Sequence, residues 1–502
     1  MKEEVIQDAA KLFDEVLTVQ ISENPKELFT DHLRIKEVLR KISAEQDKFS
    51  PNKDRVGKLP GFVEWCKKNN IKIDNVDIIK NEKGLSLVAK DDLPKESFAV
   101  EVPRSAILTT DSNKINKGLR ELFLTDQLVQ RVENCPLVLL LAHEILDPNS
   151  QWKPYLDILP AEVGGPLRMT DEEISNLKPS PAYILSLQFF RYIARHYVYF
   201  LLMIYAKESG KHLQKAGNDA IKKTLFTTKN FSFELYSWCT AIVASRVNRI
   251  PNLVQVGSKV TTSPALIPAM DLANFEFVGD VNIAQSEVYY ATPQKKIQLL
   301  LRQEIKKGDE VLIPIGTKAN HDCLIHSGFV PAEENPVNIY ELRLGFPKNT
   351  DKWKVLYAQR LGVLNPNEMA TTFIIHLSTF YSHPLEYVAF WNFAKLFVAV
   401  DHTDFNTKDN VVKARDYILK RFSLYLDGYK GLPPKEPQNG SMTMKYIWRM
   451  KNAEKKILEA MVNYFQQPIE KIVESNGPVY NKPTKEPEQE SEISEVAAAK
   501  IS

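Results

Sequence analysis

Two apolar stretches of this sequence each end in small polar residues. The first is ALIPAMDLANF, residues 265–275, and the second is VLIPIGTKANHDCLIHSGF, residues 311–329. Each begins like a buried strand, yet they lead to Asp271, Asn274 and Ser327, which an apolar core does not need. A buried polar group without a hydrogen-bond partner costs about 1–3 kcal/mol. The pattern therefore raises the question of what these polar strand ends contact.

Several familiar catalytic motifs are absent from the sequence. There is no Walker loop, GxGxxG, HExxH or GxSxG pattern, and the 9 histidines are dispersed. The 4 cysteines also stand singly, without a CxxC pair: Cys66, Cys135, Cys239 and Cys323. We therefore expect no metal, neither catalytic nor structural, and no disulfide framework. Single cysteines of this kind favour a reducing compartment.

The composition is that of an ordinary soluble globular protein. Its residues are 44% hydrophobic and 25% charged. A length of 502 residues is enough for two or three domains and a large core. A net charge of +2 gives no global field for nucleic acid or a membrane surface. The longest apolar stretch, 197–206, is too short to span a bilayer, and the first residues lack a signal-peptide pattern. We expect a monomer in the cytoplasm, with the nucleus as a second compartment.

Hydrophobic periodicity divides the chain into strands and helical blocks. Helices are expected over 1–48, and strands over 71–80, 84–93 and 97–103, followed by a helical block over 112–240. Strands return over 265–270, 286–292, 297–302 and 309–315, and a second helical block covers 352–472. The last thirty residues are rich in Pro and Glu and are predicted to be disordered. This order predicts an α+β fold with an inserted helical subdomain.

The two polar stretches together resemble the SET-domain methyltransferases, in which two such segments cross in a threaded arrangement. RVNRIP (246–251), GTKANHDCLIHSGF (316–329) and WKPYLDILP (152–160) are similar to the branch that holds the Rubisco large-subunit and actin-histidine methyltransferases. The resemblance runs from about residue 30 to about residue 470. It implies a threaded SET-domain β fold followed by an all-helical substrate-binding domain. The expected domains are an N-terminal helical region, 1–60; a SET domain, 61–335, with the insertion 112–240; a substrate-binding domain, 336–472; and a tail, 473–502.

The resemblance also implies that the polar strand ends bind S-adenosyl-L-methionine. Arg55 and Arg246 would face the carboxylate of this cofactor, where charge-assisted pairing is strong, and Asn274 would bind its amino-acid end. The remaining cofactor contacts fall on Asp271, Phe275, Ser327, Gly328 and Phe329. From the residues alone, Arg55 could equally be a surface arginine, and Asn274 a cap or turn residue.

For the protein substrate, the resemblance implies histidine methylation, with actin as the partner. Asn248 in RVNRIP would orient the target ring, next to a substrate surface that includes Met270 and Lys318. The alignment of methyl donor and nucleophile in a dry channel would supply most of the catalysis.

Several residues depart from the family pattern in the predicted active site. Ile315 stands at the catalytic tyrosine position, Phe275 at a histidine position and Met270 at a tryptophan position. An acidic cofactor contact is replaced by Ser97 and Ala99. Lys318 stands at an arginine position. These changes preserve volume better than they preserve hydrogen bonding.

Three functions therefore stay open from the sequence. The first is an active methyltransferase for a histidine of actin. The second is a SET-fold protein that has lost catalysis and binds a protein partner. The third is a methyltransferase for lysine or for another protein. Cofactor affinity distinguishes the second function from the other two.

Overall fold

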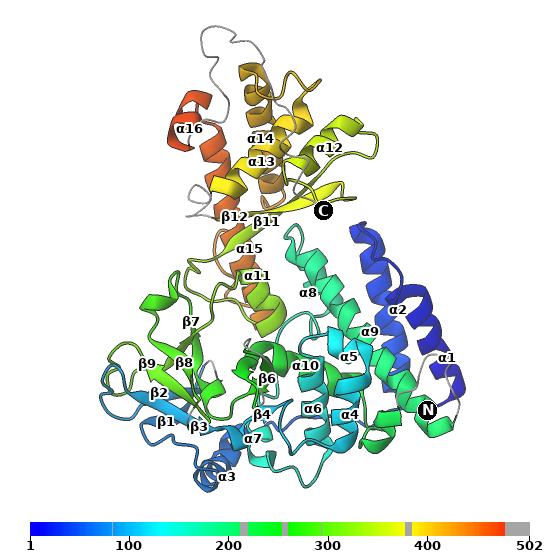
Figure 1. The fold of residues 1–502 in the computed structure, drawn as a ribbon, viewed down its shortest axis with the longest axis vertical. Helices are drawn as coiled ribbons and strands as arrows, with labels where there is room; N and C mark the ends of the chain where they lie inside the picture. Colours follow the sequence, from blue (N-terminus) through cyan, green and yellow to red (C-terminus); the bar gives the residue numbers. More distant parts are fainter. Residues whose placement is uncertain (83, 211–218, 254–259, 293, 377–383, 477–502) are drawn as a thin grey trace, which may run out of the picture. The chain divides into compact units, whose positions relative to one another are not determined.

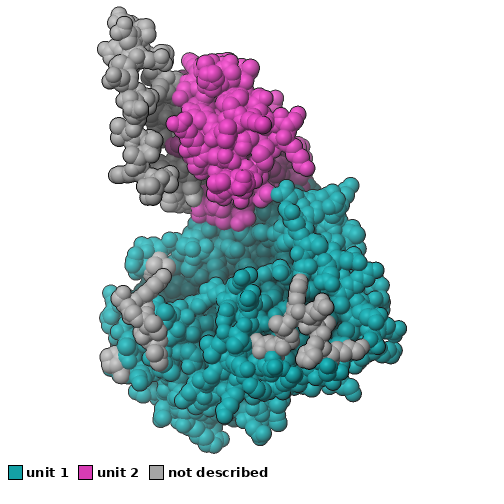
Figure 2. All heavy atoms as spheres, turned by 45° about the vertical axis from the view of Figure 1, so that its right-hand side comes forward, with its two compact units in different colours: residues 1–338, 431–454 teal, residues 339–430, 455–502 magenta. Residues whose placement is uncertain are grey.

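The computed structural model describes residues 1–82, 84–210, 219–253, 260–292, 294–376 and 384–476. The chain forms two units, coloured separately in Figure 2. The first comprises 1–338 and 431–454, and the second comprises 339–430 and 455–502. The predicted disordered tail lies outside the described residues from residue 477 on.

In the first unit, strands from two distant parts of the chain pair with one another (Figure 1). The strand Phe98–Pro103 (β3) pairs antiparallel with Lys296–Leu301 (β9), and Leu108–Thr109 (β4) pairs antiparallel with Thr262–Leu266 (β6). This pairing agrees with the predicted α+β fold. The strands of this unit are β1 (Val76–Asn81), β2 (Gly84–Ala89), β3 (Phe98–Pro103), β4 (Leu108–Thr109), β5 (Asn248–Pro251), β6 (Thr262–Leu266), β7 (Asn274–Glu276), β8 (Ser286–Ala291), β9 (Lys296–Leu301) and β10 (Leu312–Pro314). They form the sheets β1-β2, β3-β9-β8, β4-β6-β5 and β10-β7.

The two polar stretches of the sequence meet in the pair β7 and β10, which is parallel. Asn274 lies opposite Leu312, and Phe275 lies opposite Ile313. The chain enters β7 through a 3₁₀ turn, η4 (Met270–Leu272), and leaves β10 toward α11 (Asn320–Asp322) and the π-helical turn η6 (Cys323–Ser327). In a parallel pair, η4 lies at the end where β7 begins, and α11 and η6 follow from the end where β10 finishes, so the pairing alone does not bring Asp271 and Ser327 to the same edge.

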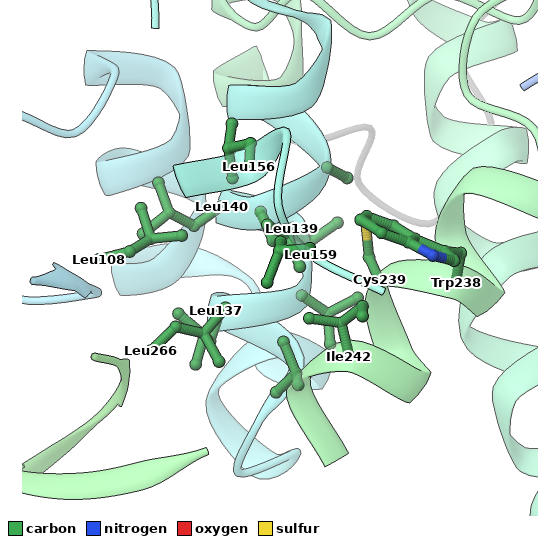
Figure 3. Close-up of a cluster of buried hydrophobic side chains, with 14 of the residues drawn as sticks. Leu108, Leu137, Leu139, Leu140, Leu156, Leu159, Trp238, Cys239, Ile242 and Leu266 are labelled. Atoms are coloured by element: carbon green, nitrogen blue, oxygen red, sulfur yellow. The ribbon is translucent and has the colours of Figure 1, made fainter. Parts of the chain in front are cut away.

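Helices surround these sheets and share one core with them. They are α1 (Glu3–Leu12), α2 (Pro25–Ser43), α3 (Arg55–Lys68), α4 (Lys117–Thr125), α5 (Gln127–Arg131), α6 (Cys135–Leu146), α7 (Lys153–Leu156), α8 (Asp171–Asn176), α9 (Ala182–Ser209) and α10 (Phe233–Arg246). In Figure 3, leucines of α6 pack against Ile242 and Trp238 of α10 and against Leu108 and Leu266 of β4 and β6. The helical insertion is thus anchored to the strand that leads into the polar turn.

The second unit contains a hairpin that the predicted all-helical domain lacks. β11 (Ile339–Gly345) and β12 (Ala370–His376) pair antiparallel. In β11, every second residue is buried: Tyr340, Leu342 and Leu344. The same alternation is visible in its sequence, IYELRLG, and is typical of a half-buried strand. The helices of this unit are α12 (Lys352–Arg360), α13 (Pro384–Val398), α14 (Lys408–Asp427), the second half of α15 (Met442–Phe465), and α16 (Ile469–Asn476).

The first half of α15 belongs to the first unit. The resemblance had implied that it lies in the C-terminal domain, 336–472. Ile447 and Met450 are buried in a cluster with Leu28, Tyr183 and Leu324. Ser180 also donates a hydrogen bond to Glu454, at 2.7 Å. These apolar and polar contacts explain why residues 431–454 group with residues 1–338.

Candidate functional site

A strained turn carries the chain from β6 to Asp271. Ala269 has φ +68° and ψ −46° and is fully buried. The other non-glycine residues with positive φ in the described ranges are all exposed: Asn70, Glu96, Lys295 and Asn367. Such a conformation costs about 1–3 kcal/mol and persists where the surroundings enforce it, often at functional sites. It places Asp271 at the start of the polar segment.

The buried Asp271 forms a charge cluster with two half-buried arginines. Arg246, at the end of α10, donates from Nη1 to the Asp271 backbone carbonyl. Arg55, at the start of α3, donates from Nε to the Ile158 carbonyl at 2.6 Å. Burial and the nearby Arg246 charge lower the pKa of Arg55 to about 10, against the attraction of Asp271. The structure thus brings together three of the predicted cofactor residues.

The carboxyl group of Asp271 experiences opposing influences. Burial raises its pKa, whereas Arg246, the Tyr155 hydroxyl and Arg55 favour its ionised form. Its Oδ2 accepts a hydrogen bond from the hydroxyl of Tyr155, a fully buried residue of α7. The sequence analysis included Tyr155 in the WKPYLDILP motif but gave it no role. No feature of the sequence alone places its hydroxyl against Asp271.

Three predicted site residues carry buried polar atoms without a hydrogen-bond partner among the described residues. They are Nε of Arg246, Oδ1 of Asp271 and Oγ of Ser327. Other such atoms occur in the core, for example on His143 and Ser186, but Arg246 and Asp271 face each other in one cluster. Because unpaired buried groups are costly, the cluster is suited to a ligand that offers both hydrogen-bond donors and acceptors.

A glycine contact fixes the position of the segment that contains Ser327. Gly328 has φ +76°, and a Cβ atom on it would lie 2.7 Å from the carbonyl carbon of Gly164. The sequence analysis did not identify Gly164, although the GG pair at 164–165 marks a close turn. The insertion and the end of the second polar stretch therefore touch through their backbones.

Two aromatic residues of the predicted site stack on each other. The rings of Phe275 and Phe329 are nearly parallel, at 3°, with centroids 6.1 Å apart. Phe277 meets Phe329 edge-on at the same centroid distance. Flat apolar faces of this kind suit a planar ring of a ligand.

Asn274 is held by groups that the sequence analysis missed. Its amide nitrogen donates to Ser86 Oγ at 2.8 Å and to Glu310 Oε1 at 2.5 Å. Both amide hydrogens are thus used within the protein. The contact of Asn274 with the amino-acid end of a cofactor stays a prediction.

Two of the predicted substrate residues are close in the chain to charged residues of the cluster. Asn248 begins β5, opposite Ala265, and its amide donates to the Arg246 carbonyl at 3.2 Å. Met270 precedes Asp271 and is fully buried. Asn248 is therefore two residues from Arg246 in the chain, and Met270 is the direct neighbour of Asp271.

Ile315 and Lys318 follow β10. Ile315 is 8% exposed and donates its backbone N–H to the Glu276 carbonyl at 3.0 Å. The Lys318 carbonyl accepts from Asn335 at 2.9 Å. In the described ranges, no hydrogen bond or ion pair joins the Lys318 side chain to the other predicted site residues. Its role in substrate binding stays a prediction.

Ser97 and Ala99, at the position of the missing acidic contact, lie at the start of β3. The Ser97 hydroxyl donates to the Pro94 carbonyl at 2.6 Å, and Ala99 is buried at an irregularity in the pairing of β3 with β9. The turn η4 packs against β2 and β3. These strands therefore contribute apolar packing rather than a charge to the site.

The described residues contain no group of three or more His, Cys, Asp or Glu side chains placed to hold a metal ion. None of the described helices is both long and apolar enough to cross a bilayer.

No family model matches the chain, but individual proteins are similar to it in sequence. The actin-histidine N-methyltransferase of Callithrix jacchus is 27% identical over 494 residues, which cover 90% of this chain and 78% of that enzyme. The Homo sapiens enzyme has the same identity and coverage. The Mus musculus enzyme is 29% identical over 344 residues, 68% of this chain and 53% of its own length.

Solved structures of the Rubisco large-subunit methyltransferase, LSMT, are similar in fold. A complex of Rubisco LSMT with AdoMet has a TM-score of 0.57 at 17% identity, covering 84% of this chain and 94% of that chain. The SET domain of LSMT with lysine and AdoHcy gives the same values. These likenesses confirm the predicted fold class. The chain therefore has the SET-domain fold and, over nine-tenths of its length, resembles the actin-histidine N-methyltransferases.

Proposed function

We propose that this chain is an S-adenosylmethionine-dependent protein methyltransferase that modifies a histidine side chain of actin. One observation supports this most directly: the unpaired atoms of Arg246 and Asp271 lie in the cluster where the resemblance puts the cofactor. The similarity to enzymes of that name over 90% of the chain supports the choice of substrate.

The residues of the cluster fit the chemistry of S-adenosylmethionine. Arg246 and Arg55 suit its carboxylate, and the free oxygen of Asp271 suits its ammonium group. The stacked faces of Phe275 and Phe329 suit the adenine ring. The bound cofactor supplies an electrophilic methyl group on a positively charged sulfur.

The side chains around the cluster favour histidine over lysine as the target. A free imidazole has a pKa near 6.5 and is largely neutral at about pH 7, whereas a free lysine amine, with a pKa near 10.4, must first lose a proton. Ile315 offers no hydroxyl to hold a deprotonated amine in place. Asn248 carries an amide that could hold an imidazole in one orientation. The protein's part in the reaction is then alignment and the exclusion of water.

A second candidate function is a protein-binding module without catalysis. Two observations favour it: Ile315 and Phe275 cannot form the hydrogen bonds of the tyrosine and histidine they replace, and the Asn274 amide hydrogens are already engaged. On this alternative the unpaired atoms of the cluster are a remnant of an ancestral cofactor site.

The test is to incubate the purified chain with isotopically labelled S-adenosylmethionine and actin, and to map labelled residues by mass spectrometry. We expect label on one histidine of actin. Label on lysine would replace the histidine assignment. Absence of label, together with absence of calorimetric S-adenosylmethionine binding, would leave the binding module. We further propose a monomer that acts in the cytoplasm or nucleus, which light scattering and localisation of the tagged chain would test.

A further inference from the structure

The hydroxyl of Tyr155 forms an unusual contact with the charge cluster. Tyr155 is fully buried in α7, and its hydroxyl donates to Oδ2 of Asp271, while Oδ1 of the same carboxylate has no partner among the described residues. One oxygen is thus fixed by the insertion, and the other is available to a further hydrogen-bond donor. The hydrogen bond therefore controls how Asp271 presents its second oxygen.

Few charged residues of the neighbouring helices and strands are available to interact with Asp271. Arg246 comes from α10 and Arg55 from α3. β2, which packs against η4, has no charged residue. Glu101 of β3 is engaged by Lys296 and Lys72 instead. When ionised, Asp271 is therefore the negative partner of two half-buried guanidinium groups.

We propose that Tyr155 is a positioning residue that keeps Asp271 ionised, and that cofactor binding consequently weakens as the pH falls. The proposal rests on the proposed function, because it assumes that the cluster binds S-adenosylmethionine. That ligand carries one more positive than negative charge. A protonated Asp271 would leave two guanidinium groups without compensation and would remove the acceptor for the ligand's ammonium group.

The sign of the pH effect follows from the groups around Asp271. Burial raises the pKa of Asp271 above its value in an unfolded chain, and the Tyr155 hydroxyl opposes this shift. The pKa of Tyr155 lies well above its ordinary value, so the phenol remains a neutral donor. Removing the hydroxyl should raise the pKa of Asp271 further. Ionised Asp271 would then be lost at a higher pH than in the wild type.

Tyr155→Phe tests this inference, with Tyr197→Phe as the matched control. Tyr197 is also fully buried in the first unit, and its hydroxyl donates to Oε1 of Gln46 at 2.9 Å, an acceptor that does not titrate. Thermal unfolding without ligand is recorded for both variants from about pH 5 to about pH 8. We expect the loss of stability in Tyr155→Phe to grow as the pH rises and Asp271 ionises. The loss in Tyr197→Phe should be constant.

Calorimetric titration with S-adenosylmethionine over the same pH range provides the second measurement. We expect Tyr155→Phe to weaken Kd about tenfold near neutral pH, the effect of one hydrogen bond to a charged group, and to move the decline of affinity to higher pH. Tyr197→Phe should follow the wild type. Parallel profiles for the two variants in either measurement would overturn the inference. Failure of the wild type to bind S-adenosylmethionine would instead refute the proposed function. The unfolding measurement would still test the effect of Tyr155 on Asp271, because it needs no ligand.

Discussion

The backbones of Gly164 and Gly328 are in direct contact: a Cβ atom on Gly164 would lie 2.1 Å from the Gly328 carbonyl oxygen. Gly164 belongs to the helical insertion, and Gly328 follows Ser327 at the end of the second polar stretch. This contact positions the Ser327–Phe329 segment at the site, and no side chain fits between the two backbones.

Gly164→Ala should therefore destabilise the first unit by about 1–3 kcal/mol, the typical cost of overpacking. Gly61→Ala, in the interior of α3 with no atom within 4 Å of its added Cβ, is the control. It should stabilise the protein by about 0.5–1 kcal/mol, because alanine favours a helix over glycine. Chemical denaturation measures both changes. An equal effect of the two substitutions on the free energy of unfolding would show that the space between the backbones of Gly164 and Gly328 admits a methyl group.

Arg246→Met should weaken S-adenosylmethionine binding by about tenfold to a hundredfold, the range for hydrogen bonds to charged groups. Arg249→Met is the matched control, because Arg249 lies three residues further on and pairs with the exposed Glu133. Isothermal titration of both variants compares their Kd values. Similar losses in both would indicate a general electrostatic effect instead of a specific site at Arg246.

Restoring Ile315→Tyr together with Phe275→His should increase the rate of methylation by about tenfold to a thousandfold, the effect of one or two positioned polar groups. The substitutions return a hydroxyl and an imidazole to positions that now carry apolar side chains. Phe277→His, which alters the neighbouring aromatic ring, is the control for a nonspecific effect. A rate for the double variant that does not exceed the wild-type rate would contradict this role for the two positions.

The second unit should show its own pH dependence through Lys395. This lysine is 5% exposed, donates to Asn406 at 3.0 Å, and burial lowers its pKa to about 8. An unfolded lysine keeps a pKa near 10.4, so between about pH 8 and that value the unfolded state binds more protons and stability rises with pH. Chemical denaturation should thus show that the free energy of unfolding of the wild type, relative to that of Lys395→Met, increases over this pH range. Lys420→Met, at an exposed position of α14, is the control for the loss of a lysine side chain.

Much of this organisation could be predicted from the sequence, because it depends on local patterns. The polar ends of the two apolar stretches drew attention to Asp271, Asn274 and Ser327, and the resemblance gave these residues, Arg55 and Arg246 their predicted roles. The helical insertion between two groups of strands followed from the resemblance together with the change of periodicity, whereas the individual strand pairs did not. The hairpin of the second unit was missed because short alternating runs are easily attributed to the helices around them.

The remaining features depend on contacts between distant segments. The hydrogen bond from Tyr155 to Asp271 spans 116 positions, and that from Asn274 to Ser86 spans 188. Neither pair carries a local pattern. The positive φ of Ala269 was also unpredictable, because alanine has no preference for that conformation and only the packing around it enforces the turn.

The central claim is most directly tested by one measurement: the position of labelled methyl on actin after incubation with the wild-type chain and S-adenosylmethionine, read by tandem mass spectrometry beside a parallel reaction with Arg246→Met. The account predicts label on a single histidine with the wild type and little or none with the variant. Wild-type reactions without label on actin, in a preparation that is folded by thermal unfolding, would contradict it.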